Sequence, residues 1–224
     1  PSVLVKFLTN IIQPKDDEVV LDPVCGTGSF LKEIRKINSN TSLYGIDIDK
    51  RQIDFANKLN ELRNDNITYV NQDSLEPFPT FIPKADYIFA NLPFGVNNLK
   101  KDVLKDYEIQ SKRLDVLLIQ KIIDSLKEGG IAFIIITEDL LFSTLTKNLR
   151  DYISKKVSLD AILSLPAGTF APYTNIKTSI LILSKRKRNR TVLYELDNVR
   201  EDSLLIKDIR NYLYEGDTSY GIPV

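Results

Sequence analysis

Short apolar runs of strand length alternate along this chain with longer segments whose apolar residues recur at helical spacing. Residues 18–22 read as a strand and lead through a glycine-containing turn to a helix over about residues 30–37. Residues 43–47 repeat the pattern, with a helix over residues 53–62. Parallel strands need a crossover, usually a helix, so this repetition predicts a parallel sheet with helices on both faces. The expected fold class is therefore α/β.

The rest of the chain continues this pattern and changes only near its end. Five more strands are expected, which gives a sheet of seven, at residues 67–71, 85–90, 131–136, 161–165 and 179–183. The last two are joined by a loop without a helix, so we expect the mostly parallel sheet to carry an antiparallel hairpin at that edge. Residues 1–185 form the predicted core domain. Residues 186–224 form a C-terminal extension that docks on the core or on other parts of a parent protein.

The charge composition bounds what the chain can bind. Lys plus Arg and Asp plus Glu each number 30, so the net charge is zero. Any contact with nucleic acid must therefore use a local patch or a partner. The chain has no His, which excludes catalysis by imidazole and a His-ligated metal, and we expect no metal site.

Cysteine use and hydropathy bear on location. Cys25 is the only cysteine, so an intrachain disulfide is excluded and a reducing cytoplasm is the expected location. No apolar run reaches the length of a membrane span, so no membrane partner is expected. Met is absent even at position 1, and we therefore expect the chain to be a processed or excised piece of a longer protein, or one whose methionines have been replaced.

The end of the first predicted strand carries the sequence Asp-Pro-Val-Cys-Gly-Thr-Gly-Ser-Phe, residues 22–30. In an open parallel sheet, ligands bind beyond the carboxyl ends of the strands. Gly26 and Gly28 permit a tight turn and a close approach of ligand to backbone. The third glycine of a dinucleotide fingerprint is missing, and the Asp22 carboxylate would repel a pyrophosphate and attract a cation. A ligand with an ammonium group and a ribose fits better, and an ordinary strand-to-helix turn is the alternative.

The next two predicted strands also end in aspartate. Asp47 is suited to accept hydrogen bonds from both hydroxyls of a ribose, and Asp49 is suited to cap the helix that follows. Asp73 can accept a hydrogen bond from an exocyclic amine. Aspartates at the ends of three consecutive strands indicate a nucleoside-like cofactor.

These motifs, followed by Asn-Leu-Pro-Phe at residues 91–94, resemble the DNA methyltransferases that methylate amino groups. The closest likeness is to the modification subunit of type I restriction systems. Residues 163–170 and 175–185 are similar to the late core of that family, so the resemblance covers residues 1–185. It implies a Rossmann-like fold that uses S-adenosyl-L-methionine, and an N6-adenine methyltransferase that acts on double-stranded DNA with a flipped adenine. It also implies a separate specificity subunit or a target-recognition domain outside these residues.

The resemblance also assigns roles within the cofactor site. Asp22 and the glycine turn would hold the methionine end, Asp47 the ribose, and Asp73 the amino group of the cofactor's adenine. The full set of expected cofactor-binding residues is Asp22, Cys25, Gly26, Gly28, Asp47, Ile48, Asp73 and Ser74.

The expected catalytic residues are Asn91, Leu92, Pro93 and Phe94. Adenine N6 is a poor nucleophile because its lone pair is delocalised into the ring. Hydrogen-bond acceptors around both N–H bonds favour the tetrahedral geometry and the charge of the attacking nitrogen, and the Asn91 side chain and the Leu92 carbonyl can supply them. Pro93 stiffens the loop, and Phe94 offers a ring on which a flipped base can stack. The family has Pro at the position of Leu92. A turn that carries a core Phe is the alternative interpretation.

Contacts with nucleic acid are expected from two further places. Phe170 and Tyr173 lie in the loop between the last two predicted strands, where Tyr173 is either a contact to the flipped base or flanking DNA or an ordinary surface tyrosine. The run at residues 185–190, which begins Lys185, Arg186, Lys187, is either a solvated linker or a set of contacts to DNA phosphates.

Other functions fit the same residues. Asn-Leu-Pro-Phe would also serve cytosine N4 or a glutamine amide in protein, because both present a planar nitrogen. A module that binds S-adenosylmethionine or assists assembly without catalysis is a second hypothesis. A dinucleotide-dependent oxidoreductase is a third, opposed by Asp22 and the missing glycine.

Overall fold

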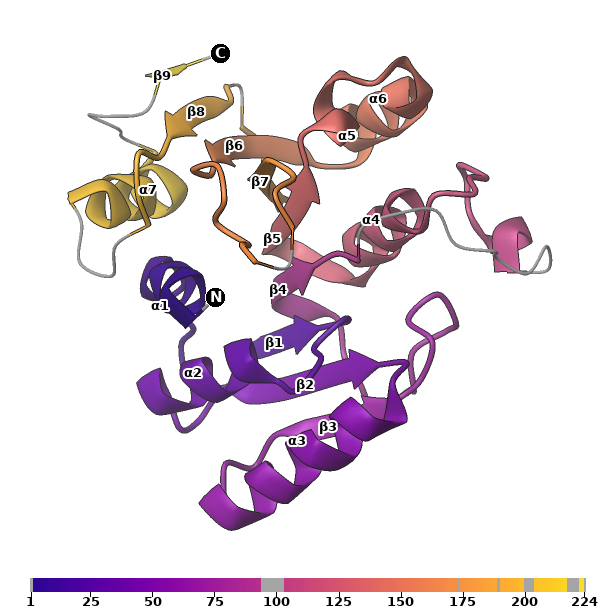
Figure 1. Cartoon of the computed structure of the whole chain (residues 1–224), viewed down its shortest axis with the longest axis vertical. Helices are drawn as coiled ribbons and strands as arrows, with labels where there is room; N and C mark the ends of the chain where they lie inside the picture. Colours follow the sequence, from indigo (N-terminus) through magenta and orange to yellow (C-terminus); the bar gives the residue numbers. More distant parts are fainter. Residues whose placement is uncertain are drawn as a thin grey trace.

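The structure is a computed structural model that describes residues 2–93, 103–172, 174–188, 190–199, 204–216 and 222–223. Within them a single sheet has the strand order β3-β2-β1-β4-β5-β7-β6-β8-β9 (Figure 1). Its strands are β1 Val19–Asp22, β2 Ser42–Asp47, β3 Thr68–Asn71, β4 Ala85–Asn91, β5 Leu126–Thr137, β6 Ser158–Ser164, β7 Thr178–Ser184, β8 Val192–Glu195 and β9 Ile222–Pro223.

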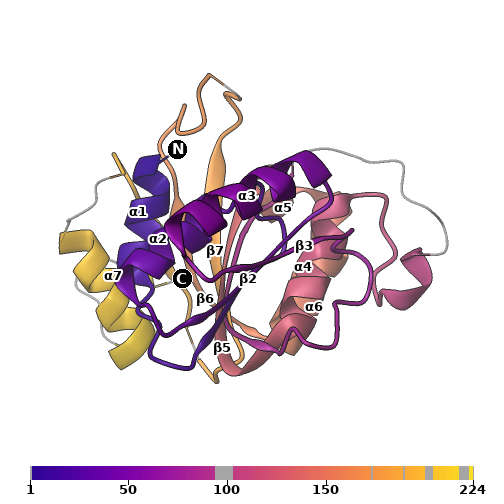
Figure 2. The same cartoon turned by 90° about the horizontal axis from the view of Figure 1, so that it is seen from below.

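The helices are α1 Ser2–Ile11, α2 Ser29–Ile37, α3 Lys50–Arg63, α4 Leu114–Ser125, α5 Asp139–Phe142, α6 Lys147–Lys156 and α7 Leu204–Glu215, with short 3₁₀ turns η1 Val103–Asp106 and η2 Thr144–Thr146. Figure 2 shows α1, α2 and α7 on one side of the sheet and α4 and α6 on the other. The predicted α/β architecture with helices on both faces is confirmed. None of the helices in the described segments is both long enough and apolar enough to cross a membrane.

The strands β1 to β5 pair in parallel, and the next strand in the sheet, β7, runs in the opposite direction. β7 lies antiparallel between β5 and β6, so β6 and β7 form the expected antiparallel hairpin. The expected count of seven strands was too low, because β8 continues the sheet beyond β6 in parallel and β9 pairs antiparallel with β8. β8 has only four residues and β9 only two, too few to show a periodic pattern in the sequence.

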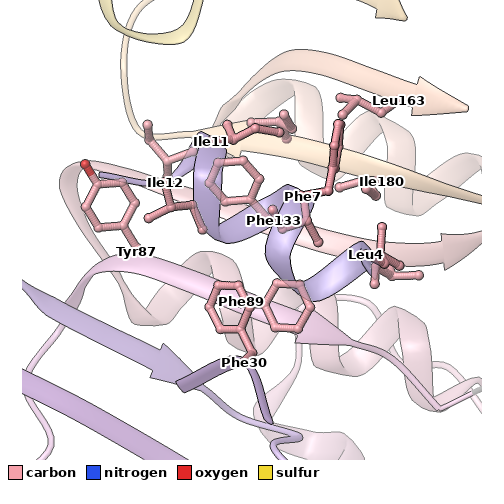
Figure 3. Close-up of a cluster of buried hydrophobic side chains, with 14 of the residues drawn as sticks. Leu4, Phe7, Ile11, Ile12, Phe30, Tyr87, Phe89, Phe133, Leu163 and Ile180 are labelled. Carbon is pink, nitrogen blue, oxygen red and sulfur yellow. The ribbon is translucent and has the colours of Figure 1, made fainter. Parts of the chain in front are cut away.

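One face of the sheet is covered by an aromatic and aliphatic core to which α1 contributes strongly. Phe7, Leu8 and Ile11 of α1 are fully buried, and Figure 3 shows this face of the helix among side chains of several strands. Phe30 of α2 stacks on Phe89 of β4, with ring centroids 3.8 Å apart and an interplanar angle of 13°. Burial of each such side chain contributes about 1.5–3 kcal/mol, which fixes α1 and α2 beside the ends of β1 and β4.

Candidate active site

The carboxyl ends of the parallel strands β1, β2, β3 and β4 meet at one edge of the sheet, and two cavities lie there. The larger, of about 640 Å³, is lined by Asp47, Ile48, Asp73 and Ser74 among other residues. The smaller, of about 250 Å³, is lined by Asp22, Cys25, Gly26 and Phe170 among others. The structure therefore gathers most of the predicted site residues around two adjacent hollows.

Asn91, the last residue of β4, lines both cavities. It is exposed, and within the part of the chain that the structure describes its side-chain amide has no hydrogen-bond partner. A group held in one cavity can therefore face a group held in the other across this side chain.

Leu92 and Pro93 line the larger cavity next to Asn91. The Leu92 side chain is buried, and the backbone N–H of Leu92 donates to the carbonyl of Ile135 on β5 at 3.4 Å. A proline at this position could make no such bond. Here the motif is held by the buried leucine and the neighbouring strand. Phe94 lies outside the described residues.

Asp47 ties the end of β2 to the glycine turn after β1. Its two carboxylate oxygens accept hydrogen bonds from the N–H of Gly26 at 2.8 Å and the N–H of Asp49 at 2.8 Å. Each carboxylate oxygen has two lone-pair sites, so both can still accept from a ligand hydroxyl. The sequence pattern predicted the ligand role of this aspartate but gave no sign of its bond to the turn.

Asp22 is a buried acid at the wall of the smaller cavity. Its side chain is 2% exposed, and its Oδ1 accepts from the N–H of Val24 at 3.1 Å. Burial raises the pKa of this carboxyl to about 8, against the lowering effect of the Val24 bond, and the charge of Asp47 raises it further. At pH 7 the carboxyl is mainly protonated. A cationic group that enters the cavity would favour its ionised form.

Gly26 and Gly28, which have the same motif role in the sequence, face different surroundings. Gly26 lines the smaller cavity, whereas Gly28 lines neither of the two. Gly28 has φ +74°, and a Cβ there would overlap the hydroxyl and ring of Tyr69 on β3. The Tyr69 hydroxyl is buried and has no hydrogen-bond partner among the described residues. Gly28 therefore makes room for a protein side chain, and this is a contact that the sequence analysis missed.

The far wall of the larger cavity comes from the segments that follow β2 and β3. Asp73 Oδ1 accepts from the N–H of Leu75 at 3.0 Å, and Ser74 Oγ donates to the carbonyl of Pro23. Ile48 is 70% exposed at the rim, so its apolar side chain is available to cover a flat ring. Leu114 and Leu118 of α4 complete this wall. Their helical spacing marks them as core residues and gives no sign of a place in a cavity.

The late loop contributes one described aromatic residue to the site. Phe170 is largely buried and lines the smaller cavity with Asn91. Tyr173, which was expected nearby, lies outside the described residues.

The basic run after β7 does not line either cavity. Arg186 donates to the carbonyl of Leu213 at 3.0 Å, and Arg188 donates to the carbonyl of Tyr212 at 2.9 Å. These carbonyls lie in the last turn of α7, which has no basic residue of its own there, so the arginines complement the helix dipole. Lys185 donates to the carbonyl of Leu126 at 2.8 Å. Lys187 is exposed.

The sequence profile of the family described as N-6 DNA methylase matches residues 1–217. The chain belongs to the N-6 DNA methylase family. It is 28% identical over 221 residues to the methylase subunit of the type I restriction enzyme EcoEI of Escherichia coli. That alignment covers 87% of this chain and 43% of the EcoEI subunit. This chain is 26% identical over 210 residues to the EcoKI methylase subunit of Escherichia coli strain K12, with 83% of this chain and 39% of that protein covered.

This chain superposes on the crystal structure of a type I restriction-modification methyltransferase subunit from Streptococcus thermophilus with a TM-score of 0.81, and the two sequences are 19% identical. The superposition covers 98% of this chain and 53% of that chain. The expected methyltransferase fold is confirmed. The chain spans about two fifths of the length of the two Escherichia coli methylase subunits.

Proposed function

We propose that this chain is the catalytic core of a site-specific DNA methyltransferase that transfers a methyl group from S-adenosyl-L-methionine to adenine N6 in a restriction-modification system. Family membership supports the reaction class. The observation that carries the proposal is the position of Asn91, an unpaired amide on the wall of both cavities. The larger cavity would take the nucleoside part of a cofactor, and the smaller one, which Asp22 and Phe170 both line, would take its methionine end and the edge of an approaching target base.

The residues present fit the proposed cofactor. The larger cavity, of about 640 Å³, is within the usual range of small-molecule sites. Asp47 and Asp73 offer acceptors to ribose hydroxyls and an exocyclic amine, and Ile48 offers an apolar surface to a purine. Asp22 is a carboxyl that an ammonium group would ionise. When bound, S-adenosylmethionine supplies an electrophilic methyl carbon on a sulfonium centre.

The chain's own residues would prepare the target amine. The Oδ1 of Asn91 and the carbonyl of Leu92 accept the two N–H bonds of adenine N6, which holds the nitrogen lone pair toward the methyl donor. They also stabilise the positive charge that develops on nitrogen, and such fixed acceptors are worth about 10²–10³-fold in rate. The surplus proton then leaves to solvent, so the absence of His from the chain is consistent with this chemistry.

The substrate in this proposal is double-stranded DNA with the adenine turned out of the stack. Phe94 and Phe170 would provide aromatic surface that offsets part of the unstacking cost of a few kcal/mol. Selection of the DNA sequence would come from a specificity subunit or another domain.

The domain division at residue 185 remains part of the proposal. In this division, residues 1–185 form the catalytic core, and residues 186–224 pack against the core in a bracing role that stabilises it. Contacts of α7 with α1, and the pairing of β8 with β6, support the bracing role.

The decisive test is Asn91→Ala in the full-length protein with its native partner subunits. Methyl transfer to duplex DNA should fall by about 10²–10³-fold or more, while calorimetry gives an unchanged cofactor Kd. Mass spectrometry of the wild-type product should detect N6-methyladenine. N4-methylcytosine or methylated glutamine would move the proposal to another planar nitrogen. Wild-type transfer by the variant would remove Asn91 from the mechanism, and cofactor binding without transfer by the wild type would favour a non-catalytic module.

A further inference from the structure

The zero net charge requires a local patch for any contact with nucleic acid, and the basic run does not provide a free one. Two of its guanidinium groups are engaged with carbonyls at the end of α7. Arg188 also lies 3.3 Å from the buried carboxylate of Asp160. A phosphate would have to compete with these internal partners for each arginine.

A second group of cations lies around a groove between α1 and α2, bordered by the end of α3. The groove has a volume of about 280 Å³ and is lined by Lys6, Lys32, Lys36, Arg63 and one acid, Glu33. Figure 2 shows α1 and α2 side by side on the face of the sheet that they share.

The charges in the groove are out of balance. Glu33 is paired with Lys36 at 2.6 Å. The pKa of Lys32 is lowered, chiefly by burial and then by the charge of Arg63, although Asp65 acts in the opposite direction. Lys32, Lys36 and Arg63 thus share one carboxylate in the lining of the groove, Glu33, and Asp65 lies near Lys32 outside that lining. An anion bound here would relieve the repulsion between Lys32 and Arg63.

The groove adjoins the candidate active site. Val5 and Ser29 line both the groove and the smaller cavity that contains Asn91. From Ser29, Lys32 and Lys36 follow along one side of α2, in steps of about 4.5 Å and about 6 Å along the helix axis. A row of cations that leads away from the cavity is suited to an extended polyanion.

We propose that the groove between α1 and α2 binds the phosphodiester backbone of the nucleic acid whose target base reaches Asn91. This assignment rests on the proposed function for the identity of the polyanion. The backbone would cross Lys32 and Lys36 while the base enters at Phe170 and Asn91. The arginines of the basic run serve the fold instead.

The test compares two double variants of the full-length protein with its native partner subunits. Lys32→Gln with Lys36→Gln removes two charges from the groove. Lys155→Gln with Lys187→Gln removes two exposed charges elsewhere, so the net charge is matched. Fluorescence anisotropy with a labelled unmethylated duplex is recorded over a range of salt concentrations. Thermal unfolding and cofactor calorimetry show whether the fold and cofactor site are intact.

The groove variant should bind the duplex on the order of tenfold more weakly, with the slope of log K against log salt reduced by about 2, while the control keeps the wild-type slope. Cofactor Kd should be the same in all three proteins. An unchanged slope in the groove variant, an equal loss in the control, or loss of subunit assembly by the groove variant would each overturn the assignment. If the slope falls as expected but the wild type makes no N6-methyladenine, the proposed function fails and the groove assignment stands.

Discussion

The ends of the first four strands and the basic segment after β7 both carry conspicuous polar residues, and the protein uses them in different ways. At the strand ends, Asp22, Asp47, Asp73 and Asn91 face two cavities. After β7, Arg186 and Arg188 are held by carbonyls of α7. The difference teaches that the density of charge in a sequence is a poor guide to a binding surface. The aspartates at the strand ends bond to nearby backbone amides and still face open cavities, whereas a long basic side chain in a loop can reach the end of a neighbouring helix.

The largest effect on stability is expected from substitutions of Arg188 and Lys187, two residues of the same basic run. Arg188→Gln should destabilise the protein by about 3–5 kcal/mol, because the Asp160 carboxylate, which is 0% exposed, loses its cationic partner. Lys187→Gln, the matched control, should change the free energy of unfolding by less than about 0.5 kcal/mol. Urea unfolding measures both. Equal effects would mean that the run is an ordinary solvated linker.

The Arg188 effect should also depend on pH. Burial raises the pKa of Asp160 to about 6, while Ser184 and then Arg188 act to lower it. Because this pKa lies above the value in the unfolded chain, Asp160 favours folding most at low pH, and that contribution is lost as the pH rises through 6. Arg188→Gln should therefore cost more at pH 8 than at pH 5, and an equal cost at both would contradict the ion pair.

A smaller effect should separate the two glycines of the first turn. Gly28→Ala should cost about 3 kcal/mol of stability, because its Cβ overlaps Tyr69 and its φ is positive. Gly26→Ala meets only the flexible end of Gln52 at 3.0 Å, so it should cost about 1–2 kcal/mol and act mainly on cofactor affinity. Thermal unfolding and calorimetry distinguish the two outcomes. The double variant Gly28→Ala with Tyr69→Leu should recover part of the loss, and no recovery would contradict the contact.

The last of these effects concerns the charge state of Asp22. Its pKa of about 8 lies above its value in the unfolded chain, so its contribution favours folding below about pH 4 and is lost as the pH rises to 8. Asp22→Asn keeps an acceptor for Val24 and should stabilise the cofactor-free protein at pH 8, with no gain at pH 4. Denaturant unfolding at the two pH values is the measurement. A constant difference would show that Asp22 is ionised in the folded protein throughout.

The sequence by itself determined the α/β class, the approximate positions of the first seven strands along the chain and the gathering of Asp22, Asp47, Asp73 and Asn91 at one edge. These features follow from local periodicity and from the rule that parallel strands end on the same side of a sheet. They need no knowledge of which side chains touch, and for that reason the candidate site could be predicted largely from strand ends.

Only the tertiary structure decided which partners those residues meet. The contact of Gly28 with Tyr69, the bond from Gly26 to Asp47, the arginines at the end of α7 and the groove between α1 and α2 all join segments that lie apart in the chain. The short strands β8 and β9 belong with them, since pairing with β6 and with each other defines them. A linear pattern records which side of an element is apolar. It does not record which charge on another element lies opposite, because packing of the whole chain sets that distance.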